Sequence, residues 1–154
     1  MAERSDGERR MKSIELTVSG TSARVVLWDD LAPKTVAALL ESLPLEIPLQ
    51  HCKWSGSACF ADVSKGAIAG VSGLESPVVS IYPGVLAVRP PAPGAPGAEL
   101  LIAYGDAEYR WPDGRRQVTP VGELEPGART VLDALAATAA KGRTTIRLRA
   151  AGER

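Results

Sequence analysis

One stretch, from Leu27 to Phe60, constrains the fold of this chain more than any other. An apolar run ends there at two acids, Asp29 and Asp30, and Pro33 follows three residues later. Proline suits the first turn of a helix, because its missing N–H has no partner there in any case. Apolar residues then recur at intervals of three and four, which predicts a short helix that packs one face on a sheet and stops at Pro44.

A second predicted strand, from Glu46 to Trp54, leaves this helix and carries the only histidine of the chain. Strict alternation would place His51 and Lys53 on one face of the strand and Trp54 on the other. Pro48 cannot donate a ladder hydrogen bond, so its position should be at an edge or a bulge. The strand therefore brings an imidazole, an ammonium group and an indole to one end of the predicted sheet.

The rest of the chain repeats the strand pattern and adds one more helix. Apolar and polar residues alternate, or apolar runs appear between turn residues, over 14–18, 23–27, 58–63, 78–82, 85–88, 100–104, 118–124 and 144–149. The second helix follows Pro126 and Gly127, has Lys141 in its last turn and Gly142 as its C-cap. This pattern predicts a mainly β protein with two helices: a closed eight-stranded antiparallel barrel capped by a helix at each end.

Length and composition support one soluble domain. The 154 residues suit a single core, and we expect a barrel domain over 13–150 between a disordered N-terminal extension, 1–12, and a disordered tail, 151–154. Lys and Arg equal Asp and Glu at 18 each, which argues against nucleic acid as a partner. No apolar run is long enough to span a membrane, and the N-terminus lacks the apolar segment of a signal peptide, so we expect a cytoplasmic protein.

The residues that commonly carry chemistry do not form a complete catalytic set. Cys52 and Cys59 with a single histidine cannot complete a zinc site, so we expect buried thiols, with a redox pair across a hairpin as the alternative. Asp29 and Asp30 are expected to form a turn and to favour the positive end of the following helix. The other interpretation of Asp29 and Asp30 is a pair of catalytic acids. For the whole chain, we expect no cofactor or metal.

Three segments, in the order expected for one fold, resemble cyclophilins. They are Leu27–Val36, with its Pro-Lys-Thr triplet; Pro83–Val88, similar to a Pro-Gly-Ile-Leu-Ser-Met strand; and Pro120–Gly127, similar to a Val-Phe-Gly-Lys-Val stretch. The chain is more similar still to uncharacterised bacterial and archaeal cyclophilin-like families. In those families a histidine strand runs into a Trp-Ser-Gly turn, as at His51–Gly56, and a strand resembles Leu100–Gly105.

Cyclophilins that isomerise prolyl bonds place an arginine in a groove on the barrel surface, within a Phe-His-Arg motif. Here Lys53 is the only counterpart of that arginine, and aligning the two requires a shift of one residue after His51. A lysine cannot present a rigid two-donor fork. The phenylalanines that hold the proline ring are also missing, because Phe60 is the only phenylalanine of the chain.

The resemblance therefore implies an uncharacterised binding domain without the standard isomerase residues and with no assigned catalytic residue. The expected ligand is a small molecule or a peptide in a barrel-surface groove lined by His51, Lys53, Trp54, Tyr104 and Trp111. The alternative is a peptidyl-prolyl cis-trans isomerase with altered active-site residues. A homodimer formed through an apolar, proline-rich rim is a further expectation.

Overall fold

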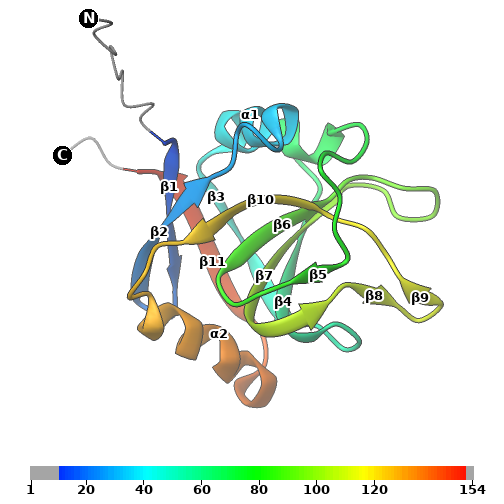
Figure 1. The fold of residues 1–154 in the computed structure, drawn as a ribbon. Coiled ribbons are helices and arrows are strands. Elements are labelled where there is room, and N and C mark those ends of the chain that lie inside the picture. The colour runs from blue at the N-terminus through cyan, green and yellow to red at the C-terminus, as the bar shows by residue number, and fades with distance from the viewer. Residues whose placement is uncertain (1–10, 152–154) are drawn as a thin grey trace, which may run out of the picture.

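Eight strands close into one antiparallel barrel in the computed structural model, which describes residues 11–151 (Figure 1). The strands of the barrel are β1 (Ser13–Val18), β2 (Thr21–Leu27), β3 (Leu45–His51), β4 (Gly56–Val63), β6 (Val85–Arg89), β7 (Ala98–Glu108), β10 (Thr119–Leu124) and β11 (Thr144–Ala150). Their order is β4-β3-β11-β1-β2-β10-β6-β7, and β7 pairs with β4 to close the ring. The predicted closed eight-stranded barrel is confirmed.

Three short strands lie outside this ring. The first, β5 (Ser80–Ile81), adds to β7, and the other two, β8 (Arg110–Trp111) and β9 (Gly114–Arg115), pair with each other as a hairpin. The turn of that hairpin is Pro112-Asp113, two residue types that favour turns. Because the hairpin follows directly on β7, it can cover the outer face of the barrel beside that strand.

The two helices, α1 (Pro33–Ser42) and α2 (Arg129–Lys141), lie on opposite sides of the barrel (Figure 1). Val36 and Leu39 of α1 and Val131 and Leu135 of α2 all belong to the buried cluster that fills the barrel. The helix ends agree with the sequence: α1 begins at Pro33, and α2 stops at Gly142, whose φ of 86° an L-residue rarely adopts. A short 3-10 helix, η1 (Ala67–Gly70), packs beside α1.

One wall of the barrel is buried on both faces. Leu100 and Ile102 of β7 point into the barrel, whereas Leu101 and Ala103 belong to a second cluster on the outside. That outer cluster includes Tyr109 and is covered in part by the segment that carries β8 and β9. The double burial explains why β7 reads as a continuous apolar run where other strands alternate.

Pro48 satisfies its predicted constraint without lying on an open edge. It pairs with Thr145 of β11 on one side, and on the other side β3 pairs with β4 only at Gln50 and His51. Pro48 therefore lies beyond the β3–β4 pairing, where a missing donor disturbs no ladder.

A distant glutamate, Glu75, caps the N-terminus of α1. Its carboxylate accepts hydrogen bonds from the N–H of Lys34 at 3.2 Å, the N–H of Thr35 at 2.7 Å and the hydroxyl of Thr35 at 2.7 Å. Asp29 and Asp30 form the predicted turn, but the N-cap residue is Ala32 and the carboxylate at the helix end comes from the loop after η1. The sequence could not show this, because the loop returns to α1 only in the folded barrel.

Replacing Glu75 with glutamine is expected to destabilise the fold by about 1 kcal/mol at pH 7, the usual cost of weakening an N-cap. Desolvation raises the pKa of Glu75, but the bonds from Thr35 and Lys34 and the charge of Lys34 outweigh it, so the pKa is lowered overall. A lowered carboxyl pKa gives stability that is complete above the ordinary value of 4.5 and is lost as the pH falls through the folded value.

Denaturant unfolding of wild type and Glu75→Gln at several pH values would check this expectation. The difference between the two proteins should disappear in acid. The exposed Glu41→Gln in the same helix is the matched control and should leave the free energy of unfolding unchanged. A difference that persists undiminished at pH 3 would contradict an electrostatic cap.

The predicted disordered segments, 1–12 and 151–154, lie mostly outside the described residues, so their disorder stays a prediction. Among residues 11–151, none of the helices is both long enough and apolar enough to cross a membrane.

Candidate functional site

A pocket of about 520 Å³ opens on the outside of the barrel, beside the outer cluster. It lies between the β3–β4 turn, the loop from β6 to β7 and the first residues of the β8–β9 hairpin. The residues that line it are Gln50, His51, Cys52, Lys53, Trp54, Ser55, Phe60, Asp62, Arg89, Ala95, Pro96, Glu99, Tyr109, Arg110, Trp111 and Pro112. Four of the five residues expected in the groove are among them, and Tyr104 is not.

His51 is held by protein groups on both ring nitrogens. Its Nδ1 lies 2.8 Å from the carbonyl oxygen of Cys52, and its Nε2 lies 2.6 Å from the hydroxyl of Tyr104. A carbonyl can only accept, so Nδ1 carries the proton, and in the neutral ring Nε2 accepts from Tyr104. Tyr104 thus reaches the pocket only through His51, which orients the β3–β4 turn rather than offering a free base.

Lys53 and Trp54 lie in the β3–β4 turn and not on a strand. The strand ends at His51, three residues earlier than the alternation predicted. One last cross-strand hydrogen bond joins the Cys52 N–H to the carbonyl oxygen of Ala58 at 2.9 Å, and the chain then bends over residues 53–55. Trp54 is consequently 54% exposed, too exposed for a barrel-core residue. Among residues 11–151, Lys53 makes no ion pair, so its ammonium group is available at the pocket mouth.

A buried ion pair, which the sequence analysis missed, forms one wall of the pocket. Arg89 is the last residue of β6 and Glu99 is the second residue of β7, and the two residues pair directly across the strands. The Nε of Arg89 lies 3.1 Å from Oε2 of Glu99, and the two side chains are only 8% and 14% exposed. The signal in the sequence was an arginine at the end of one apolar strand and a glutamate at the start of the next, on either side of one loop.

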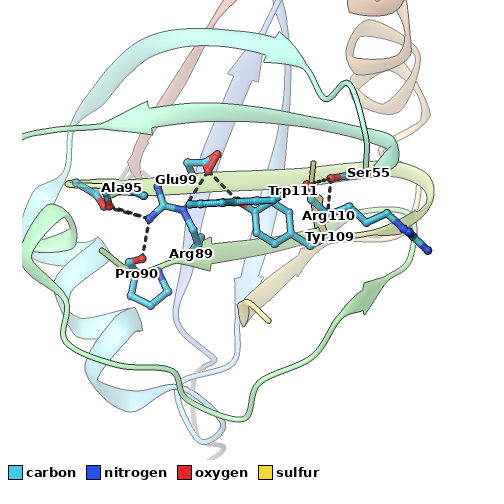
Figure 2. Close-up of polar contacts among 9 residues, drawn as sticks. Ser55, Arg89, Pro90, Ala95, Glu99, Tyr109, Arg110 and Trp111 are labelled. Carbon is cyan, nitrogen blue, oxygen red and sulfur yellow. Dashed lines mark hydrogen bonds and ion pairs between the residues drawn. The ribbon is translucent and has the colours of Figure 1, made fainter. Parts of the chain in front are cut away.

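Arg89 also holds the proline- and glycine-rich loop between these strands. Its Nη1 donates to the carbonyl oxygens of Pro90 at 2.8 Å, Ala95 at 3.3 Å and Gly97 at 3.4 Å (Figure 2). One side chain therefore ties the loop to the pocket.

Aromatic residues extend the network from Glu99 to the pocket rim. The hydroxyl of Tyr109 donates to Oε2 of Glu99 at 2.8 Å and accepts from Nε1 of Trp111 at 2.8 Å (Figure 2). Burial raises the pKa of Tyr109, and the carboxylate of Glu99 adds to that shift, so the phenol stays protonated and donates. The guanidinium of Arg116 lies over the Trp111 ring, 4.0 Å from its centre, in a cation–π contact.

Both cysteines are buried and free, as the simpler interpretation predicted. Burial raises the pKa of Cys52 to about 12 and raises the pKa of Cys59 as well. Cys59 packs in the barrel interior, with its sulfur 3.2 Å from the hydroxyl of Thr138, whereas Cys52 belongs to the outer cluster. Neither thiol is activated as a nucleophile at neutral pH.

The arrangement is suited to binding rather than to covalent catalysis. The pocket combines aromatic walls with charged groups, but the contacts of His51 join it to the phenol of Tyr104 and a backbone carbonyl, not to a serine, threonine or cysteine side chain. Within residues 11–151, no group of three or more His, Cys, Asp or Glu side chains could hold a metal ion.

Comparisons with known proteins agree on the fold and do not supply an activity. The family model described as "Protein of unknown function (DUF3830)" matches residues 14–150. None of the curated proteins has a sequence that matches this chain.

Solved structures give the same architecture at low sequence identity. The structure of McbB in complex with tryptophan matches with a TM-score of 0.70 and 18% identity, over 92% of this chain and 45% of the McbB chain. The chain thus spans less than half of McbB. A hypothetical protein, AF2241 from Archaeoglobus fulgidus, matches with a TM-score of 0.59 and 17% identity, over 98% of this chain and 100% of its own.

A cyclophilin-type peptidyl-prolyl cis-trans isomerase from Cryptosporidium parvum has a TM-score of 0.49 and 10% identity, over 92% and 99% of the two chains, which is too distant to bear on activity. The predicted relation to uncharacterised proteins with a cyclophilin-like barrel is confirmed by the family match and by the closed barrel itself.

Proposed function

The chain belongs to the DUF3830 family, whose function is unknown, and we propose that this protein binds a small molecule or a peptide in the pocket on the outside of its barrel. The observation that carries the proposal is the pocket itself. Its volume of about 520 Å³ falls within the usual range for ligand sites. Its walls place the rings of Trp54, Phe60 and Trp111 beside the cationic groups of Lys53 and Arg110.

The charged residues of the pocket favour an anionic or zwitterionic ligand over a cationic one. Three cationic side chains line the pocket, from Lys53, Arg89 and Arg110, against two acidic ones, from Asp62 and Glu99. An exposed tryptophan such as Trp54 is costly to leave in water, and a ligand that covers it would remove apolar area from solvent. McbB is described as a complex with tryptophan, so amino acids belong in any screen of this pocket.

A thermal-shift screen of metabolites and short peptides, followed by variants of the exposed pocket residues, tests the proposal. Trp54→Ala and Lys53→Ala are expected to weaken the hits at least about fivefold each, because each removes a direct contact worth about 1 kcal/mol. Both side chains are exposed, so the fold should be retained.

The matched controls are Tyr82→Ala, an exposed aromatic residue outside this pocket, and Lys65→Ala, an exposed lysine in another loop. Neither should change affinity. If every hit binds the Trp54 and Lys53 variants as tightly as it binds wild type, the pocket is not the binding site and the proposal is wrong.

The prolyl isomerase alternative has less support. Lys53, its counterpart for the catalytic arginine, is a flexible exposed residue in a turn. Arg89, the buried arginine of the pocket, already uses Nε and Nη1 on Glu99 and on loop carbonyls. A protease-coupled assay on an Ala-Pro peptide is therefore expected to show no rate above background at micromolar protein. A clear catalysed rate would restore the alternative.

A further inference from the structure

Arg89 and Glu99, the two buried charged residues of the pocket, each have one polar side-chain atom without a hydrogen-bond partner among residues 11–151. Nε and Nη1 of Arg89 have protein acceptors, but no acceptor for its Nη2 lies among residues 11–151. Glu99 is similar: its Oε2 accepts from Arg89 and Tyr109, and within the same described range no donor reaches its Oε1. Both residues line the pocket.

Neither free atom is sealed inside the protein. Across residues 11–151, no buried side-chain nitrogen or oxygen lacks a hydrogen-bond partner, so Nη2 of Arg89 and Oε1 of Glu99 must both be reached by solvent. The residues themselves are only 8% and 14% exposed at their side chains. Both residues line the pocket, which is where a ligand could reach these atoms.

From this pairing we propose that Arg89 and Glu99 recognise the charged head of a free α-amino acid. Nη2 of Arg89 would donate to the carboxylate, and Oε1 of Glu99 would accept from the ammonium group. The inference rests on the proposed binding function and names the ligand class for the same pocket. Hydrogen bonds between charged partners of this kind are among the strongest that proteins make.

The ion pair itself selects for a ligand with both charges. Arg89 and Glu99 are already joined through Nε and Oε2 at 3.1 Å, so the two free atoms belong to adjacent groups. A carboxylate without an amine would place a second negative charge beside Glu99, and an amine without a carboxylate would meet Arg89. A zwitterion can bond to both Nη2 of Arg89 and Oε1 of Glu99, and it adds no net charge to the ion pair. The rings of Trp54, Phe60 and Trp111 then favour an aromatic or large apolar side chain.

Calorimetry with three matched probes tests this inference. L-phenylalanine has both charged groups, phenethylamine lacks the carboxylate, and 3-phenylpropanoate lacks the ammonium group. L-phenylalanine is expected to bind at least about tenfold more tightly than either partial analogue, because each loses one charge-assisted hydrogen bond. N-acetyl-phenylalanine amide, which has neither charge, should bind weakest.

Variants separate the head group contact from a general effect on the pocket. Glu99→Gln is expected to weaken L-phenylalanine about tenfold while leaving 3-phenylpropanoate equal or tighter, since only the ammonium group needs the carboxylate. Glu41→Gln makes the same chemical change at an exposed residue of α1, outside this pocket, and should alter neither affinity.

The outcomes distinguish this inference from the proposed function. If 3-phenylpropanoate or the uncharged amide binds as tightly as L-phenylalanine, or if none of the twenty amino acids binds, head-group recognition is wrong. In that case other screen hits that still depend on Trp54 and Lys53 would leave the proposed binding function standing. If those two variants affect no hit either, both proposals fail.

Discussion

Glu99→Ala is expected to lower the free energy of unfolding by about 3–5 kcal/mol, because it leaves the guanidinium group of Arg89 buried without its counter-ion. Arg89 is 8% exposed at its side chain and cannot turn out to water without releasing the loop carbonyls that it binds. The same substitution removes the acceptor of the Tyr109 hydroxyl, which is itself buried. Urea unfolding followed by tryptophan fluorescence measures the loss directly.

A double variant separates the unpaired charge from the lost packing. Arg89→Met with Glu99→Leu removes both charges together, and apolar side chains of similar volume often replace such pairs at little cost. We expect it to recover at least half of the stability that Glu99→Ala loses. The residual loss comes from the carbonyls of Pro90, Ala95 and Gly97, which lose their donor, and from the Tyr109 hydroxyl, which loses its acceptor. If Glu99→Ala unfolds within about 0.5 kcal/mol of wild type, the pair is not buried in solution.

Gly122→Ala is expected to destabilise the barrel by at least about 3 kcal/mol or to prevent folding, because overpacking at a rigid backbone has no cheap relief. A Cβ at this position would clash with the carbonyl oxygen of Val26 and lie 3.2 Å from the Cα of Leu27. Both are backbone atoms of β2, so the neighbour cannot move aside as a side chain would. The β10–β2 pairing is only three residues long, Gly122 to Leu124. A clash at Gly122 would therefore separate β10 from β2.

The control for Gly122→Ala is Gly70→Ala, at the end of η1. A Cβ there meets nothing within 4 Å, so the change should be close to neutral. Thermal unfolding by circular dichroism would compare the two variants. An unchanged unfolding temperature for Gly122→Ala would mean that β2 and β10 pack less closely than the distances given above.

The barrel could be predicted from the sequence because its signals are local. Alternation over residues such as Ile14, Leu16 and Val18 determines which face of a strand is buried, and Pro33 and Gly142 mark where helices begin and end. Each of these preferences acts over a few residues and survives in the folded chain. The three segments that resemble cyclophilins then supplied the order of the elements.

The site could be predicted only in part, because its contacts join residues that are far apart in the chain. His51, Lys53, Trp54 and Trp111 do meet at one pocket, but Arg89, Glu99 and Tyr109 were not recognised. Arg89 stands at the start of a proline- and glycine-rich segment, and only the β6–β7 register places it opposite Glu99. The predicted position of Trp54 was wrong because the alternation was extended past His51, where the strand ends and the chain bends into the turn.

The wall of the barrel that is buried on both faces has a consequence for how this chain can change over evolutionary time. On β11, alternate residues such as Thr145 and Arg147 are exposed and free to vary in polarity. On β6, all five residues from Val85 to Arg89 are buried, so no position there can exchange polarity without disturbing either the barrel interior or the outer cluster. Sequence drift should therefore concentrate on β1, β2 and β11, and the side of the barrel that bears the pocket should diverge most slowly, whatever ligand it binds.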